Sequence, residues 1–398
     1  MPSPYIPIFI FFGPIMELNI RMNNSGRLTK LDGLRGLLSL IVALNHSFLV
    51  VAIPTFANVW GQNFLTFTNL QAKLQQLLML IGNGGAAVTT FFILSGMVLG
   101  QSMGRVEFSS KGLLGFFLKR LLRLYPVYVV IILTTAIYMR TGFHYQTFPF
   151  ASAWYLWWMN FQMTIKEFLY NLFFIHTYLG GVTWTLRVIL IASFVMPAFY
   201  QVSKTAGRLT NLIFSLFLVL ASFTIFNISG FRDLRYLYMF YLGLILPRYK
   251  SFFAALPSWL IHFFVPFGLI SLLAIRYITD EYLGGLIESV LAWFAIGIIV
   301  FSSRTKIFDF LNNKVFQFFG RISYSLYLVH FTVLYILARV MFNVYPNLPY
   351  GSAYLMIHVS LFILSLSVAT LFSLLVYRYV EIPSSQVGSA VNKKIQQF

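Results

Sequence analysis

The sequence predicts an all-α membrane protein: a polytopic helical bundle of about ten transmembrane helices with one re-entrant or interfacial segment. Three observations support this fold class. Of the 398 residues, 59% are apolar and only 38 are charged (28 Lys and Arg, 10 Asp and Glu), whereas a soluble domain is about half apolar and a quarter charged. Apolar stretches long enough to cross a bilayer recur along the chain. Basic residues gather in alternate connections, as they do on the cytoplasmic side of membrane proteins.

This composition also excludes several classes of protein. A soluble multidomain enzyme and a disordered chain would be far more polar. The chain has no cysteine, which excludes a disulfide-rich secreted scaffold and thiolate chemistry. The net charge of +18 is explained by loops on the positive side of the membrane, so nucleic acid is not an expected partner.

The apolar stretches predict the individual spans, and the basic clusters predict their sides. Placing every basic cluster in the cytoplasm requires an even number of crossings and puts both termini there, with the plasma membrane as the expected location. The aromatic segment 147–181 would therefore dip into the membrane and return, lining a cavity, since two full crossings by its short pieces would give twelve spans. The ten expected spans are 36–53, 86–103, 124–140, 184–203, 209–228, 234–248, 257–277, 282–302, 321–341 and 352–377.

The domain organisation follows from the same spans. Residues 22–385 are predicted to form one membrane domain, and residues 386–398 a cytoplasmic tail. Prolines interrupt the apolar run within residues 1–21, which is too short to span. We expect this segment to be interfacial or to reflect a start assigned too early.

The first span carries the sharpest functional signal. Titratable residues inside spans are costly and are functional candidates by default. Arg35 and His46 are eleven residues apart, about three helical turns, so they share one face. Arg35 would hold an anionic ligand and His46 would act as a general base. Asp32 suits a helix N-cap. The alternative is that Arg35 pairs with Asp32 and His46 is a packed histidine.

A second group contains Ser95 and Gly96, followed by Gly100 and Gly104. Small residues at this spacing permit close helix approach, and packing alone explains the glycines. Ser95, beside these glycines, is a candidate catalytic residue.

A third group places cations beside the start of a span. Lys119, Arg120 and Arg123 would form an anion site, or would only determine the topology. Glu381, at the end of the last span, is an expected ion-pair partner for Arg35 or Arg123.

The ninth span aligns three polar side chains. Ser323, Tyr327 and His330 recur at i, i+4 and i+7, which places them on one helix face toward one neighbour. His262 and His358 stand alone in their spans, and we interpret them as packed imidazoles.

Five motifs in this order resemble the acyltransferase-3 family of integral membrane acyltransferases over residues 27–385. They are LDGLRG (31–36), FFILSG (91–96), KRLLRLYP (119–126), GRISYSLYLVH (320–330) and YRYVEIP (377–383).

The resemblance implies about ten core spans and transfer of acyl groups from cytoplasmic acyl-CoA to hydroxyls. It implies that Arg35 and His46 form the family's arginine–histidine pair, with His46 the base. Arg120 and Arg123 match the basic pair near the acyl-CoA entry. One departure is Ile189, where the family often has a glutamate; the loss would impair catalysis or alter the acceptor.

We therefore expect an O-acyltransferase that moves an acetyl or other acyl group from acyl-CoA, with acetyl-CoA the expected donor, to a hydroxyl of a cell-surface glycan or a lipid-linked precursor. Membrane lipids are its other partners, and no metal is expected. The candidate residues are His46, Arg35, Ser95 and His330 for catalysis and Lys119, Arg120, Arg123 and Glu381 for the donor. The alternative function is a transporter or flippase for a glycan or lipid-linked carrier.

Overall fold

The computed structural model describes residues 25–52, 70–159, 161–228, 231–303, 305–346 and 354–397. The regular elements in these ranges are helices, and the predicted all-α fold class is confirmed. The predicted N-terminal segment 1–21 lies outside the described residues.

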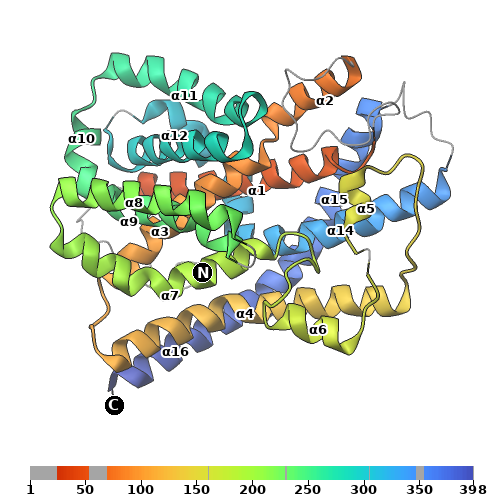
Figure 1. Cartoon of the computed structure of the whole chain (residues 1–398), viewed down its shortest axis with the longest axis horizontal. Helices are drawn as coiled ribbons and strands as arrows, with labels where there is room; N and C mark the ends of the chain where they lie inside the picture. Colours follow the sequence, from red (N-terminus) through yellow and green to blue (C-terminus); the bar gives the residue numbers. More distant parts are fainter. Residues whose placement is uncertain are drawn as a thin grey trace, which may run out of the picture.

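One helix, α1 (Ser25–Phe48), lies at the centre of the bundle and positions the site (Figure 1). It contacts helices from both halves of the chain, which explains how residues distant in sequence meet on its surface. These neighbours include α3 (Gly84–Met103), α12 (Glu281–Phe301), α13 (Lys314–Arg321), α14 (Ser323–Val344) and α15 (Tyr354–Val376).

The remaining helices surround this centre. They are α2 (Leu70–Ile81), α4 (Ser110–Thr141), α5 (Ala153–Trp157), α6 (Ile165–Leu172), α7 (Trp184–Thr205), α8 (Arg208–Asn227), α9 (Leu237–Ile245), α10 (Lys250–Ala255), α11 (Ser258–Ile278) and α16 (Ile382–Gln397). Short 3₁₀ or π turns join them: η3 (Arg232–Tyr236), η4 (Leu246–Tyr249), η5 (Lys306–Asn312) and η6 (Tyr377–Glu381).

Seven helical stretches in the described residues are long and apolar enough to cross a membrane, so the chain is an integral membrane protein. They are Lys73–Met103, Ser110–Thr141, Trp184–Thr205, Ser258–Ile278, Glu281–Phe301, Ser323–Val344 and Leu355–Gln397. The other three predicted spans correspond to α1, α8 and α9. Since α9 has only 9 residues between two 3₁₀ turns, it does not cross as a straight α-helix. The count of ten stays a prediction.

The aromatic segment 147–181 contributes no helix long enough to cross. It contains α5, with 5 residues, and α6, with 8 residues, and both lie at one end of the bundle (Figure 1). Polar contacts fix its loops: the hydroxyl of Tyr178 donates to the carboxylate of Glu167 and holds the pKa of that carboxyl below its ordinary value.

Glycines allow two helices to approach at the middle of the bundle. A Cβ on Gly96 of α3 would collide with the carbonyl oxygen of Phe240, and a Cβ on Gly243 of α9 would collide with that of Ile93. The packing interpretation of the FFILSG glycine is thus confirmed.

At one edge of the bundle, α16 runs alongside α4 (Figure 1), and Gly388 of α16 contacts the backbone of Lys119 in α4. The predicted tail residues 386–397 therefore belong to a helix that packs on the bundle.

Candidate active site

Three arginines line a first cavity, of about 170 Å³, which we call the arginine cavity. They are Arg35 from α1 and Arg120 and Arg123 from α4. Arg120 and Arg123 are three residues apart, so they lie on one face of the helix. In the described part of the chain, no carboxylate lies within 4 Å of either of these two guanidinium groups. The cavity therefore combines two guanidinium groups that lack a direct carboxylate contact with otherwise mostly apolar walls.

Arg35 is held in place by two neighbours. Its Nη2 donates to the Oγ of Ser323, at 3.1 Å, and its Nη1 lies 3.7 Å from the carboxylate of Asp32. The expectation that Asp32 caps a helix was wrong, because α1 already begins at Ser25 and Asp32 lies within it. The alternative pairing of Arg35 with Asp32 is present, and Arg35 nonetheless lines the cavity.

A second and larger cavity, of about 480 Å³, is lined by His46 and by seven aromatic rings together with polar and aliphatic residues; we call it the aromatic cavity. Its rings are Trp154, Trp158, Trp184, Tyr236, Tyr277, Tyr327 and Phe331. Trp154 and Trp158 belong to segment 147–181, so the expectation that this segment lines a cavity is confirmed. The ring centroid of Trp154 lies 5.4 Å from that of His46.

His46 is oriented by His330, 284 residues away in the sequence. The Nδ1 of His330 lies 3.1 Å from the carbonyl oxygen of Leu326, which can only accept, so Nδ1 carries the proton. In neutral His330 the Nε2 is then an acceptor, and the 2.9 Å contact with His46 requires His46 Nδ1 to donate. Neutral His46 is left with a lone pair on Nε2, the arrangement that a general base needs.

The two cavities meet at α3 and α14, because Val88 and Tyr327 line both of them. The expectation that Ser323, Tyr327 and His330 share a face toward one neighbour holds for two of them, since Ser323 contacts Arg35 and His330 contacts His46, both on α1. Tyr327 instead has its ring beside Phe91 of α3. The candidate base thus lies beside the boundary between a cationic cavity and an aromatic one.

Other predicted site residues divide between the cavity wall and its surroundings. Ser95 and Ile189 line the arginine cavity, whereas Lys119 and Glu381 do not. Glu381 is buried and accepts a hydrogen bond from Ser325, at 2.6 Å. The predicted pairing of Glu381 with Arg35 or Arg123 is not a direct contact: within the described ranges, no arginine or lysine lies within 4 Å of its carboxylate. Glu381 nonetheless interacts electrostatically with both arginines over a longer distance.

The two histidines interpreted as packed imidazoles lie outside both cavities. His358 is buried, with its Nδ1 2.9 Å from the carbonyl oxygen of Ser47. His262 is exposed, so its interpretation as a packed imidazole was wrong; its Nδ1 is bonded to the carbonyl of Ser258, one turn earlier in its own helix.

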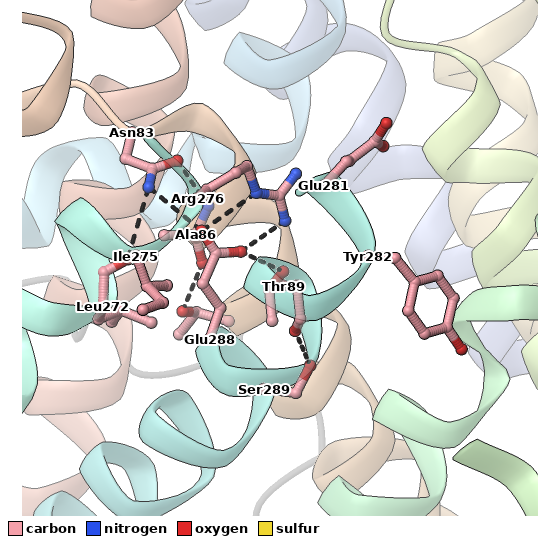
Figure 2. A network of polar contacts seen from close by, with 12 residues as sticks. Asn83, Ala86, Thr89, Leu272, Ile275, Arg276, Glu281, Tyr282, Glu288 and Ser289 are labelled. Atoms are coloured by element: carbon pink, nitrogen blue, oxygen red, sulfur yellow. Dashed lines mark hydrogen bonds and ion pairs between the residues drawn. The ribbon is translucent and has the colours of Figure 1, made fainter. Parts of the chain in front are cut away.

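A buried ion pair at the aromatic cavity was missed by the sequence reasoning (Figure 2). Arg276 Nε and Nη2 lie 3.1 and 2.5 Å from the two carboxylate oxygens of Glu288, which is fully buried. Asn83 donates to the same carboxylate, at 3.2 Å. The sequence does contain an indication of this pair. Arg276 lies near the end of the apolar stretch 257–277, twelve residues before Glu288.

The chain matches the sequence model of the acyltransferase domain of the acyltransferase-3 family over residues 28–378. The chain belongs to the acyltransferase-3 family. This membrane acyltransferase is therefore an enzyme, which favours the transferase hypothesis over the transporter hypothesis. Neither among curated proteins nor among solved structures was a match found.

Proposed function

We propose that this acyltransferase moves an acetyl or other acyl group from acyl-CoA, entering the arginine cavity, to a hydroxyl group in the aromatic cavity. The acceptor would be a cell-surface glycan or its lipid-linked precursor. The observation that carries the proposal is the contrast between the two adjoining cavities, one with three arginines and the other with an oriented histidine among aromatic rings.

The charges favour the arginine cavity for the donor. Coenzyme A carries phosphates, and guanidinium groups without carboxylate partners form strong charge-assisted bonds with them. A volume of about 170 Å³ is below the usual range for a whole drug-sized ligand. Only the acyl-pantetheine arm would therefore enter, with the phosphates at the mouth near Lys119, Arg120 and Arg123 and with Arg35 further along the arm.

The histidine pair supplies the chemistry. His46 Nε2 takes the proton of the acceptor hydroxyl while the hydroxyl oxygen bonds to the thioester carbonyl carbon. The C–S bond then breaks, and the CoA thiolate leaves with the proton that His46 returns. His330 holds the His46 tautomer, and the two cavities hold the reactants in contact.

The proposal is tested by a single-turnover assay with the purified protein, labelled acetyl-CoA and an envelope glycan fraction. Label should pass from CoA into an ester on the glycan. A protein that moves glycan across a vesicle membrane and leaves the label on CoA would be a transporter, contrary to the proposal.

The orientation is part of the proposal and makes a separate prediction. Placing the cationic start of α4 in the cytoplasm puts Ser110 inside the cell and Thr147, beyond the other end of α4, outside. Both side chains are exposed, and the chain has no native cysteine. In intact cells an impermeant maleimide should label the Thr147→Cys protein and not the Ser110→Cys protein. The reverse labelling would contradict the orientation.

A further prediction concerns Ile189. The missing carboxylate is proposed to limit the present enzyme. Arg187 cannot supply its counter-charge, because it is paired with Asp233 and bonded to the carbonyl of Phe174. The three cavity arginines can, since Ile189 lines the same cavity.

Ile189→Glu should therefore accumulate normally and raise kcat about tenfold, less than a full general base contributes. Ile189→Gln, which adds the same shape without charge, is the matched control. If Ile189→Glu only raised the KM for acetyl-CoA, the carboxylate would merely neutralise the donor site, and the prediction would be wrong.

Glu288 faces Arg276 rather than the arginine cavity, so it does not replace the missing glutamate. Removing its charge would leave the Arg276 guanidinium, whose side chain is 28% exposed, without its carboxylate partner.

A further inference from the structure

The aromatic cavity contains a polar group that the transfer chemistry above does not use. Arg276 and Asn83 both line this cavity, and both are fixed by the buried carboxylate of Glu288 (Figure 2). Asn83 also donates to the carbonyl of Leu273, at 2.8 Å. Thr89, on the same wall, lies 3.4 Å from the second carboxylate oxygen. The group is therefore rigid, and its members come from α3, its N-cap, α11 and α12.

The guanidinium of Arg276 retains hydrogen-bond capacity toward the cavity. An arginine has five N–H donors in a fixed fork, and the contacts with Glu288 use Nε and Nη2. The Nη1 lies over Gly85, where a Cβ would be only 2.7 Å from it, so this glycine leaves room for the guanidinium against the wall. In the described part of the chain, Nη1 has no protein acceptor.

The charges of this cavity are already balanced. Arg276 is paired with Glu288, and Glu281, the other charged residue of the wall, is paired with Arg235 at 3.0 Å. An acceptor carboxylate or phosphate would therefore meet no uncompensated cation here and would gain little electrostatic attraction. The arginine cavity, by contrast, offers two guanidinium groups without carboxylate partners. The two cavities therefore differ in the charge of the ligand that they suit.

We infer that Arg276, Asn83 and Glu288 form the acceptor subsite of the aromatic cavity, and that this subsite takes an uncharged sugar unit. The inference rests on the proposed function. Arg276 Nη1 would donate to an acceptor oxygen, Glu288 is a positioning residue for Arg276, and the negatively polarised faces of Trp154 and Trp184 suit the C–H face of a pyranose. The sugar hydroxyl would then face His46 on the same cavity wall.

The test uses the full-length protein, labelled acetyl-CoA and two acceptors that differ by one carboxylate, octyl glucoside and octyl glucuronide, each below its critical micelle concentration. Arg276→Ala would leave the buried carboxylate of Glu288 without its cation and would strongly destabilise the protein, so the informative variant is Arg276→Gln/Glu288→Gln, in which two amides can bond to each other. The matched control is Arg187→Gln/Asp233→Asn, which removes an ion pair that lies outside both cavities.

Wild type should show a kcat/KM for octyl glucoside at least about tenfold above that for octyl glucuronide. The Arg276/Glu288 variant should lower the value for octyl glucoside at least about tenfold, while the KM for acetyl-CoA stays within about twofold and the control variant matches wild type.

Three results would overturn the inference and leave the proposed function intact. They are preference for octyl glucuronide, an unchanged kcat/KM for octyl glucoside in the folded double variant, and His46-dependent hydrolysis of acetyl-CoA with acylation of neither glycoside. A wild type without any His46-dependent turnover of acetyl-CoA would overturn both proposals.

Discussion

Replacing His46 by alanine should lower acyl transfer by about 10²–10⁴-fold, the usual contribution of a general base, while the protein still accumulates in the membrane. The lone pair on Nε2 would be lost, and no other histidine of the described residues lines either cavity. His46 already borders an open cavity, so truncation should cost little stability. The rate of acyl transfer and the amount of protein in the membrane are measured in the same preparations.

The controls separate a catalytic role from packing. His358→Ala removes a buried imidazole that is bonded to a backbone carbonyl outside both cavities, and it should have a mild effect on transfer. His330→Gln keeps an oxygen that can accept from His46 Nδ1, whereas His330→Leu does not. The glutamine variant should therefore retain more activity than the leucine variant. A His46→Ala enzyme with activity near that of wild type would show that the base is wrongly assigned.

Replacing Arg120 or Arg123 by glutamine should raise the KM for acetyl-CoA about tenfold or more, because each guanidinium offers charge-assisted bonds to phosphate. The KM for the acceptor should stay unchanged. The wild-type KM for acetyl-CoA should also rise with ionic strength, and this dependence should weaken in each variant, since salt screens the attraction.

Lys204→Gln is the matched control for these two variants, because Lys204 is an exposed cation near the end of α7 and lines neither cavity. Its KM for acetyl-CoA should equal that of wild type. If Arg120→Gln, Arg123→Gln and Lys204→Gln changed the KM for acetyl-CoA equally, the effect would come from the overall charge of the protein and not from the arginine cavity.

The positions of most helices could be predicted from the sequence because each needs a long apolar stretch, and length alone identifies it. The polar residues that share one face of α1, and those that share one face of α14, could be predicted as well, since helical periodicity sets which side chains share a face. The contact of His46 with His330 could not, because it depends on how two helices 284 residues apart pack.

The failures have local physical causes. Asp32 resembles an N-cap, but the residues before it continue the helix, so α1 begins at Ser25, about two turns before the expected start. Glu381 was expected to pair with an arginine, yet the π-helical turn Tyr377–Glu381 places it against Ser325. The ion pair of Arg276 with Glu288 joins two neighbouring helices across a short turn, and two isolated charges in apolar stretches do not by themselves indicate that they meet.

We propose that donor and acceptor reach His46 from the two adjoining cavities, and that these cavities open to opposite sides of the membrane. The most direct test uses vesicles with the protein in one orientation, labelled acetyl-CoA on the side where Ser110→Cys is labelled, and a glycan fraction sealed on the other side. The account predicts that label appears in ester linkage on the sealed glycan, and that His46→Ala abolishes it. Transfer only to glycan on the same side as acetyl-CoA would contradict the account.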